Sequence, residues 1–303
     1  MTTLQNSPTS IRAVRPPSRL LPALALTGYL AVAATALVRP WLPALSPEHD
    51  YATRYGYATP AWVSLAAAAA GLLTLVVRRR RPTGRAPMLA GAAALVLLLW
   101  ASAGVVLDLF RGFFWFTGIP AGEFGLVDWR GAVGRVAAAA ALVPTALIML
   151  RTAAPRSTDR APARWPALVA AGLALVYPGV KFFWFLGGTF ARPVPYPEGF
   201  PVAESVILVG GVALSLLLMR GLQSRLLHAG LIATGWLVSL VTLNQGMLPI
   251  FGMINYGLGG PMPAAVAAFS GSGWMTAVLY GSWAALGVFL VIATRNSRRR
   301  TCR

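Results

Sequence analysis

Few side chains in this chain could do chemistry, and most of them stand alone. Asp108 is the single acid in a stretch from residue 86 to residue 116 that is otherwise apolar except for Arg111. Arg135 and Glu204 each lie two or three residues inside an apolar segment, and Asn244 and Gln245 form an adjacent amide pair. An isolated charge within a membrane span costs at least about 2.5–3.5 kcal/mol, so such residues usually mark function.

Each of these five candidate functional residues has two interpretations. Asp108 is either a functional carboxylate or a loop residue bonded to nearby backbone. Arg135 and Glu204 either pair with each other across a helical bundle or belong to a substrate site. Asn244 and Gln245 either bond between helices or line a polar cavity.

No sequence pattern indicates a catalytic centre, a metal or a cofactor. The two histidines, His49 and His228, lie far apart, and Cys302 is the single cysteine, so neither a Cys/His metal cluster nor an intrachain disulfide is expected. A phosphate-cradling Gly-Lys loop, a nucleophile elbow and a zinc-protease helix are all missing. We expect no metal and no cofactor, and the sequence leaves enzymatic activity open.

The low fraction of charged residues indicates that this chain is a membrane protein. The chain has 303 residues, of which 57% are hydrophobic and 11% charged, against roughly 25% charged residues in soluble domains. Its 26 basic and 8 acidic residues give a net charge of +18. Because the basic residues lie in short runs between apolar segments, anionic lipid headgroups are the expected partner, and nucleic acid is not.

The apolar segments predict an all-α fold, a polytopic transmembrane helical bundle. About 20 residues of helix cross roughly 30 Å of hydrocarbon. About eight segments have this length, and they form one transmembrane domain over residues 20–294, at approximately 20–38, 59–77, 87–107, 132–150, 166–185, 202–219, 227–247 and 275–294. They are too long and continuous for the strands of a barrel.

The arginines predict the direction of threading. With the N-terminus in the cytoplasm, 19 of the 26 basic residues fall in short cytoplasmic segments, as the positive-inside rule requires. The cytoplasmic segments include a tail at 1–19, expected to be disordered, and a basic tail at 295–303. Both termini are therefore expected in the cytoplasm. A cleaved signal peptide at the first span is an alternative, because Ala34–Ala36 resembles a cleavage site.

An internal repeat relates the third and fourth spans to the fifth and sixth. At an offset of 69 residues, the Phe-Phe-Trp-Phe sequence at 113–116 matches that at 182–185, and Arg151 matches Arg220. The two copies would be helical hairpins in the same orientation, which is a parallel repeat. Asp108 then corresponds to Tyr177, and Arg135 corresponds to Glu204.

The aromatic sequences themselves are expected where helices leave the lipid, since Trp and Tyr concentrate at headgroup level. The alternative is an aromatic ligand site. Residues 86–116 form either one long tilted span or a span followed by a short interfacial helix. The Gly- and Pro-rich segment 248–274 is expected to be an outer loop, with a re-entrant loop as the alternative.

The Ala- and Arg-rich spans and the FFWFLGGT sequence at 182–189 resemble uncharacterised multi-pass membrane proteins of actinomycetes. This resemblance implies a bacterial cell membrane (inner membrane) and transfers no catalytic pattern. Three functions remain open. Small-solute transport is the function that we favour, because of the repeat and the prolines within the spans. The others are a non-catalytic component that acts through protein partners, and a membrane-embedded enzyme with a lipid-linked substrate.

Overall fold

The computed structural model describes residues 19–43, 59–82, 84–152, 163–192, 199–262 and 273–301. Within these ranges the chain is helical and forms no strand. The expectations for the N-terminal tail, His49 and Cys302 concern residues outside the described ranges, as does the segment 263–272.

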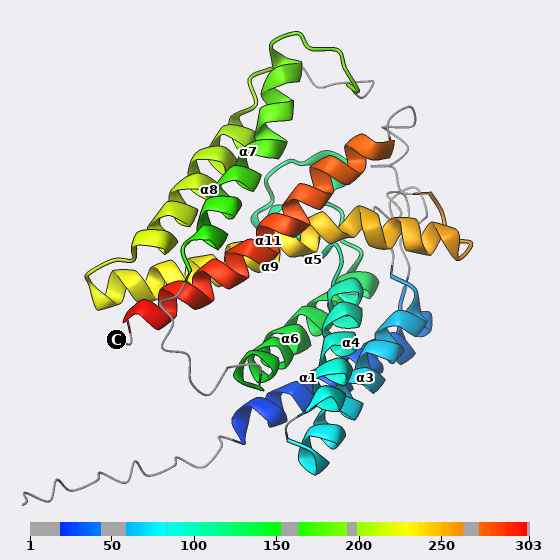
Figure 1. Ribbon diagram of the computed structural model, residues 1–303. Coiled ribbons are helices and arrows are strands. Elements are labelled where there is room, and N and C mark those ends of the chain that lie inside the picture. Colours follow the sequence, from blue (N-terminus) through cyan, green and yellow to red (C-terminus); the bar gives the residue numbers. More distant parts are fainter. Residues whose placement is uncertain are drawn as a thin grey trace, which may run out of the picture.

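Four helices form an N-terminal unit, in which each helix packs against the next and the last packs against the first (Figure 1). They are α1 (Leu20–Val38), α3 (Ala61–Arg80), α4 (Arg85–Ala101) and α6 (Trp129–Thr152). Their shared core includes Tyr29, Val63 and Leu98, all fully buried. The segments are rich in Ala and Leu, which are strong helix formers, and small side chains allow α1 and α6 to approach closely at Gly28 and Ala141.

The remaining long helices form a C-terminal unit around α11 (Gly273–Thr301). Helix α11 packs along α7 (Trp165–Phe185) and α9 (Arg225–Gly257), and α7 packs along α8 (Val202–Arg220). This unit has its own apolar core, built from α7, α8, α9 and α11. The two units are thus separately packed bundles.

Helix α9 joins the two units. Asn244 of α9 donates a hydrogen bond to the carbonyl oxygen of Ser102 at 2.9 Å. Phe251 of α9 stacks on Trp100 of α4, with ring centroids 5.3 Å apart, and is part of the N-terminal core. The contact between the units is therefore a stretch of α9 against the end of α4 and against the following helix, α5 (Val105–Thr117).

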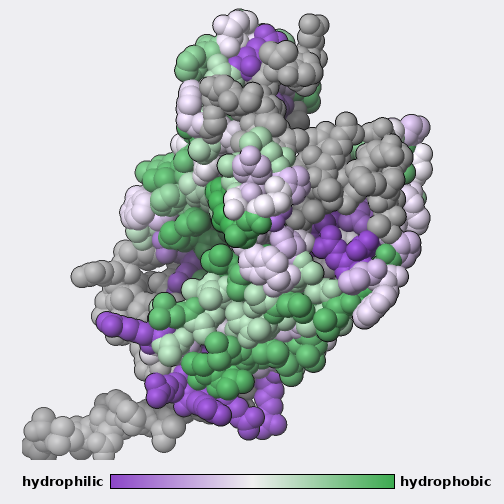
Figure 2. All heavy atoms as spheres, turned by 90° about the vertical axis from the view of Figure 1, so that its right-hand side faces the viewer, coloured by the Kyte–Doolittle hydropathy of each residue, from purple (hydrophilic) through white to green (hydrophobic). Residues whose placement is uncertain are grey.

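The structure has the surface of a multi-pass membrane protein. Among the described residues, seven helical segments are long and apolar enough to cross a bilayer: Leu20–Trp41, Ala61–Arg80, Arg85–Thr117, Trp129–Thr152, Trp165–Phe185, Arg225–Gly257 and Trp274–Arg298. Helix α8 is not among these seven. Large apolar side chains such as Leu24, Leu30 and Leu89 are at least half exposed on the outside, where lipid would cover them. In Figure 2 hydrophobic residues cover much of the lower part of the molecule, and hydrophilic residues lie along its lower edge.

The arginine-rich helix ends lie on one side of the molecule. In Figure 1 the start of α1, the α3–α4 connection, the α8–α9 connection and the C-terminus all lie at the lower and left side. Helix α3 ends on Arg78–Arg80 and α8 ends on Arg220, where cations favour the negative end of the helix dipole. Arg78 also bonds the carbonyl oxygen of Ile148, at the end of α6, at 3.0 Å.

Helix α9 differs from the sequence-based expectation, and residues 86–116 follow one of the two forms expected for them, a span and then a second, shorter helix. Helix α9 continues to Gly257, so the prediction of a loop from residue 248 is wrong for 248–257. Pro249 lies inside this helix, and its neighbours Leu248 and Phe251 are buried, so packing outweighs the loss of one backbone hydrogen bond. The third apolar segment is interrupted: α4 stops at Ala101, and a second helix, α5 (Val105–Thr117), follows a buried turn at Ser102–Gly104.

Adding a single methyl group at Gly246 should push α9 away from α11. A Cβ atom on Gly246 would lie 2.2 Å from the backbone nitrogen of Ala284 and 2.7 Å from the carbonyl oxygen of Tyr280. Since backbone cannot move as a flexible side chain does, Gly246→Ala should destabilise the fold by about 1–3 kcal/mol. Thermal unfolding of the purified protein in detergent measures this. Gly230→Ala on the same helix is the control, because no atom lies within 4 Å of its added methyl group. Equal melting temperatures for the two variants would contradict the packing described.

Candidate functional site

Helix α5 buries charge and exposes aromatic rings. Its buried residues are Val105, Asp108 and Arg111, spaced three apart and so on one face of the helix. Phe113 and Phe116 on other faces are 54% and 84% exposed. This pattern is the reverse of a helix in a soluble protein, and it suits a helix whose outer face contacts lipid.

The buried face of α5 meets the start of α6 in an ion pair. Arg135 binds Asp108 through both ends of its guanidinium group: Nε donates to Oδ2, and Nη2 donates to Oδ1 at 3.0 Å. A third residue, Asp128, lies 3.5 Å from Nη2 through its Oδ2. All three residues are at most 5% exposed. A two-point Arg–carboxylate contact is the strongest geometry for such a pair, and removing one partner would leave a buried charge.

Two further residues build this layer of charge. Asp128 caps α6, because its Oδ2 accepts a hydrogen bond from the backbone N–H of Gly131 at 3.0 Å. Arg111, 1% exposed, donates from Nε to the carbonyl oxygen of Phe124 at 3.1 Å and lies over the Phe124 ring. Asp108, Arg111, Asp128 and Arg135 are called the ion cluster below. It ties α5, the loop at 122–128 and α6 into one piece.

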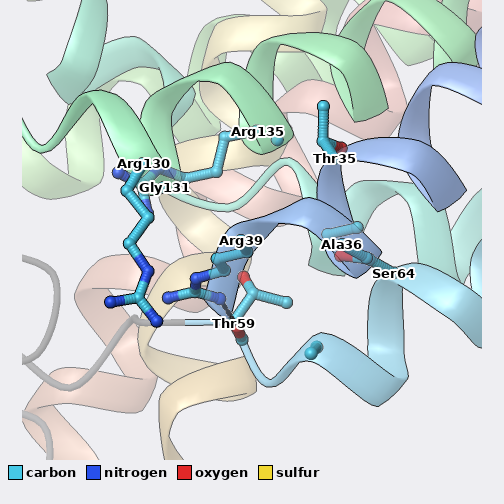
Figure 3. Close-up of a pocket in the computed structure, with 11 residues that line it drawn as sticks. Thr35, Ala36, Arg39, Thr59, Ser64, Arg130, Gly131 and Arg135 are labelled. Atoms are coloured by element: carbon cyan, nitrogen blue, oxygen red, sulfur yellow. Dashed lines mark hydrogen bonds between the residues drawn. The ribbon is translucent and has the colours of Figure 1, made fainter. Parts of the chain in front are cut away.

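A small polar pocket adjoins the ion cluster on the side of α1 and α3 (Figure 3). Its walls are the end of α1, the start of α3, the end of α4 and the first two turns of α6. Arg39 and Arg130 both line it, and Figure 3 shows the Arg130 side chain extending from α6 toward Arg39. Arg39 is held by a 2.7 Å hydrogen bond from Nη1 to the carbonyl oxygen of Thr59. We call this space the arginine pocket.

An aromatic groove lies on the other side of the same ion pair. Asp108 lines it together with Phe113, Trp115 and Phe116 of α5, and Trp129 and Val136 of α6. The rings of Trp115 and Trp129 make an edge-on contact at 5.1 Å. The first Phe-Phe-Trp-Phe sequence therefore forms the wall of a groove as well as an exposed aromatic surface.

The structure separates the other predicted residues from this site. Asn244 is 1% exposed and bonds Ser102, so it connects helices, while Gln245 is half-buried and makes no side-chain hydrogen bond to a described residue. Glu204 accepts a hydrogen bond from the hydroxyl of Tyr177 at 3.4 Å. The hypothesis of an Arg135–Glu204 pair is therefore wrong, because Arg135 turns to Asp108 on the helix that immediately precedes it.

Sequence reasoning found Asp108 and Arg135 but missed four of their neighbours. The positive-inside assignment leaves Arg39, Arg111 and Arg130 outside the cytoplasmic segments, and it gives neither them nor Asp128 a role at a site. The sequence does contain a signal, because basic residues are rare outside the cytoplasmic segments. Arg111, Asp128 and Arg130 also lie close to Asp108 or Arg135 in sequence. Nothing in the sequence indicates that Arg39 joins them, because that contact depends on how α1 packs against α6.

The chemistry open to this site is charge recognition. Among the described residues, no three His, Cys, Asp or Glu side chains group closely enough to hold a metal ion. Asp108 is bound by Arg135 and Asp128 by the end of α6, so both carboxylates are occupied. The arginine pocket, by contrast, presents guanidinium groups to a cavity. Comparison with protein-family models, curated proteins and solved structures finds no match to this chain.

Removing one partner of the Asp108–Arg135 pair should lower the stability of the fold far more than removing both partners. Asp108→Asn leaves the Arg135 guanidinium buried without its carboxylate and should cost about 3–5 kcal/mol. Asp108→Leu combined with Arg135→Met should recover most of that loss, because neither charge remains. Unfolding of the purified protein in mixed micelles measures both. Glu204→Gln is the matched control and should cost below about 1 kcal/mol, since its hydrogen bond is long and half-exposed. A double variant less stable than Asp108→Asn would refute the pair's role.

Proposed function

We propose that this chain crosses a bacterial cell membrane eight times, with both termini in the cytoplasm, and carries a small solute. Helix α8 is the eighth span in this proposal. It has 19 residues, and its only charges are Glu204 in the first turn and Arg220 at the end. At 1.5 Å per residue it reaches about 28 Å, close to the hydrocarbon thickness.

The position of the arginines supports the orientation. The basic helix ends gather on one side of the molecule, and the positive-inside rule assigns such a side to the cytoplasm. Anionic phospholipid headgroups would lie against it. The ion cluster would then lie near the opposite boundary: Arg135 is 16 residues, roughly 24 Å of helix, from Arg151.

The observation that carries the transport proposal is the interrupted segment at the joint of the two units. Non-helical backbone within a membrane protein is tolerated only where protein or a water-filled cavity satisfies it, and transporters use such broken helices at their working sites. Here the break at Ser102–Gly104 faces α9 of the other unit, and Asn244 satisfies the Ser102 carbonyl. Gly104 adopts φ 85°, which only glycine adopts freely.

Separate packing of the two units supports the same mechanism. Each unit has its own apolar core, and they meet mainly at the Asn244–Ser102 and Phe251–Trp100 contacts. Two rigid bundles joined at a short contact can rock against each other, which is how many carriers expose a site alternately to each side. That motion would break the buried hydrogen bond between Asn244 and Ser102, and a different polar contact would replace it.

A recurring contact supports a parallel repeat in this proposal. The Asp108–Arg135 pair and the Tyr177–Glu204 pair each span 27 residues, and both residues of one pair match those of the other at the 69-residue offset. In each case a polar side chain of one helix reaches the first turns of the next. An ancestral hairpin with one such contact would explain both.

Locking the joint should stop transport. Ser102→Cys and Asn244→Cys, in a Cys302→Ser background, place one thiol on each unit for a reducible bis-thiosulfonate cross-linker. The purified protein is reconstituted in liposomes and tested with labelled amino acids, sugars, carboxylates and inorganic phosphate. At least one solute should enter faster than in protein-free liposomes. Cross-linking should slow the entry of that solute about tenfold or more, because a covalent link between the two units blocks their motion. Reduction of the cross-link should restore entry.

The control pair is Ala163→Cys with Asn296→Cys, which are neighbours within the C-terminal unit, since Asn296 bonds the Ala163 carbonyl at 3.1 Å. Cross-linking this pair should leave uptake unchanged. The transport proposal is wrong if no solute of the panel enters, or if locking Ser102 to Asn244 has no effect on uptake.

A further inference from the structure

We infer that the arginine pocket binds the oxygens of a phosphate group at the non-cytoplasmic boundary of the membrane. The inference stands whether or not the chain carries solutes, because it depends only on the N-terminal unit. Its basis is a juxtaposition: two arginines from different helices, three hydroxyl side chains and the first turns of α6 surround one cavity.

The pocket is built for an anion by the residues that line it. Arg39 and Arg130 bring two guanidinium groups, and Ser64 brings a hydroxyl, whereas the hydroxyls of Thr35 and Thr59 already donate to the carbonyl oxygens of Val32 and Trp100.

One donor in the pocket lacks a partner. The Nε atom of Arg130 is buried, and no described residue accepts a hydrogen bond from it. A buried donor without an acceptor costs about 1–3 kcal/mol, and more when it is charged. An anion oxygen in the pocket would supply the acceptor. Guanidinium groups match phosphate well, because adjacent N–H groups contact two oxygens at once.

The size of the pocket limits what enters it. The space open to the centre of a water molecule is about 20 Å³, which holds one or two waters. A complete headgroup does not fit, whereas one or two phosphate oxygens do. The rest of the ligand must therefore remain at the opening, which suits a phosphate carried by a larger molecule at the surface.

The depth of the arginine pocket in the membrane favours a phospholipid as the molecule that carries the phosphate group. The pocket lies where α1 ends and where α3 and α6 begin, 19 to 24 residues of helix from their arginine-rich ends. That span is roughly 28–36 Å, one hydrocarbon thickness. Trp41, Trp62 and Trp129 flank the same helix ends and are 79%, 49% and 50% exposed. Exposed tryptophans mark headgroup level, where lipid phosphates lie.

The test is binding by the purified full-length protein in a nonionic detergent, measured by calorimetry and native mass spectrometry. The probes are short-chain phosphatidylglycerol, inorganic phosphate and a phosphate-free glucosyl diacylglycerol. Phosphatidylglycerol should bind with one site per chain, and the glucosyl lipid should not. Arg130→Ala should weaken binding about tenfold or more, as expected for one charged hydrogen-bonding partner. Arg81→Ala, an exposed arginine at the opposite end of the same unit, should change it less than twofold.

A second variant keeps every charge. Gly134 lines the pocket, and a Cβ atom there would lie 3.7 Å from Thr35 Oγ1, an ordinary contact, so Gly134→Ala should fold normally and narrow the cavity. It should weaken binding as Arg130→Ala does. Competition by millimolar inorganic phosphate would identify a free anion as the ligand, and its failure to compete would identify the lipid.

Two results would overturn the inference. One is that neither phosphatidylglycerol nor inorganic phosphate binds the wild-type protein. The other is that Arg81→Ala weakens binding as much as Arg130→Ala while Gly134→Ala has no effect, because attraction to headgroups would then be general rather than a property of this pocket.

Discussion

Hydrocarbon offers no hydrogen-bond partner, and this constraint governs where polar groups lie in the molecule. Within the spans, several polar side chains are satisfied by protein: Tyr29 bonds Thr145 at 2.6 Å between α1 and α6, and Thr74 bonds the carbonyl of Ala70 at 2.8 Å. Charged groups lie at the ends of the N-terminal unit. At one end Arg78 caps α6, and at the other the ion cluster and the arginine pocket form a second charged layer.

The Asp108–Arg135 pair gives the second layer its shape. It fixes α5 against the start of α6 and so places the aromatic groove on one side and the arginine pocket on the other. A Cβ atom on Gly131 would lie 2.2 Å from Asp128 Oδ2 and 2.6 Å from Arg135 Nη1, so a side chain there would displace these two groups. A charge pair that costs free energy to bury therefore serves to define one arrangement of the helices.

Hydropathy predicted the helical class and seven of the apolar segments, because length and composition alone decide whether a helix can cross a bilayer. It could not predict the break after Ala101. Ser102, Ala103 and Gly104 are small and apolar enough to continue a helix, and the Asn244 side chain that contacts the turn lies 142 residues away in sequence. The length of α9 was also missed, since Gly and Pro suggest a loop unless neighbouring helices cover them.

The candidate site was predicted in part for a similar reason. Asp108 and Arg135 were conspicuous as charges in apolar sequence, but their pairing depends on the angle between α5 and α6. The proposed repeat places Arg135 and Glu204 at equivalent positions, and equivalent positions in two parallel copies need not touch. Each has a partner within its own hairpin, 27 residues earlier. Arg39 and Arg130 become a site only when tertiary packing brings α1 to α6.

The central claim is that the ion cluster lies at the external boundary and the arginine-rich ends lie in the cytoplasm. Single cysteines in a Cys302→Ser background, at Leu126 beside the cluster and at Arg81 at the other end, report this directly. A membrane-impermeant maleimide should label Leu126→Cys in intact cells, and it should label Arg81→Cys only after the membrane is permeabilised. Labelling of Arg81→Cys in intact cells, with Leu126→Cys protected, would contradict the account.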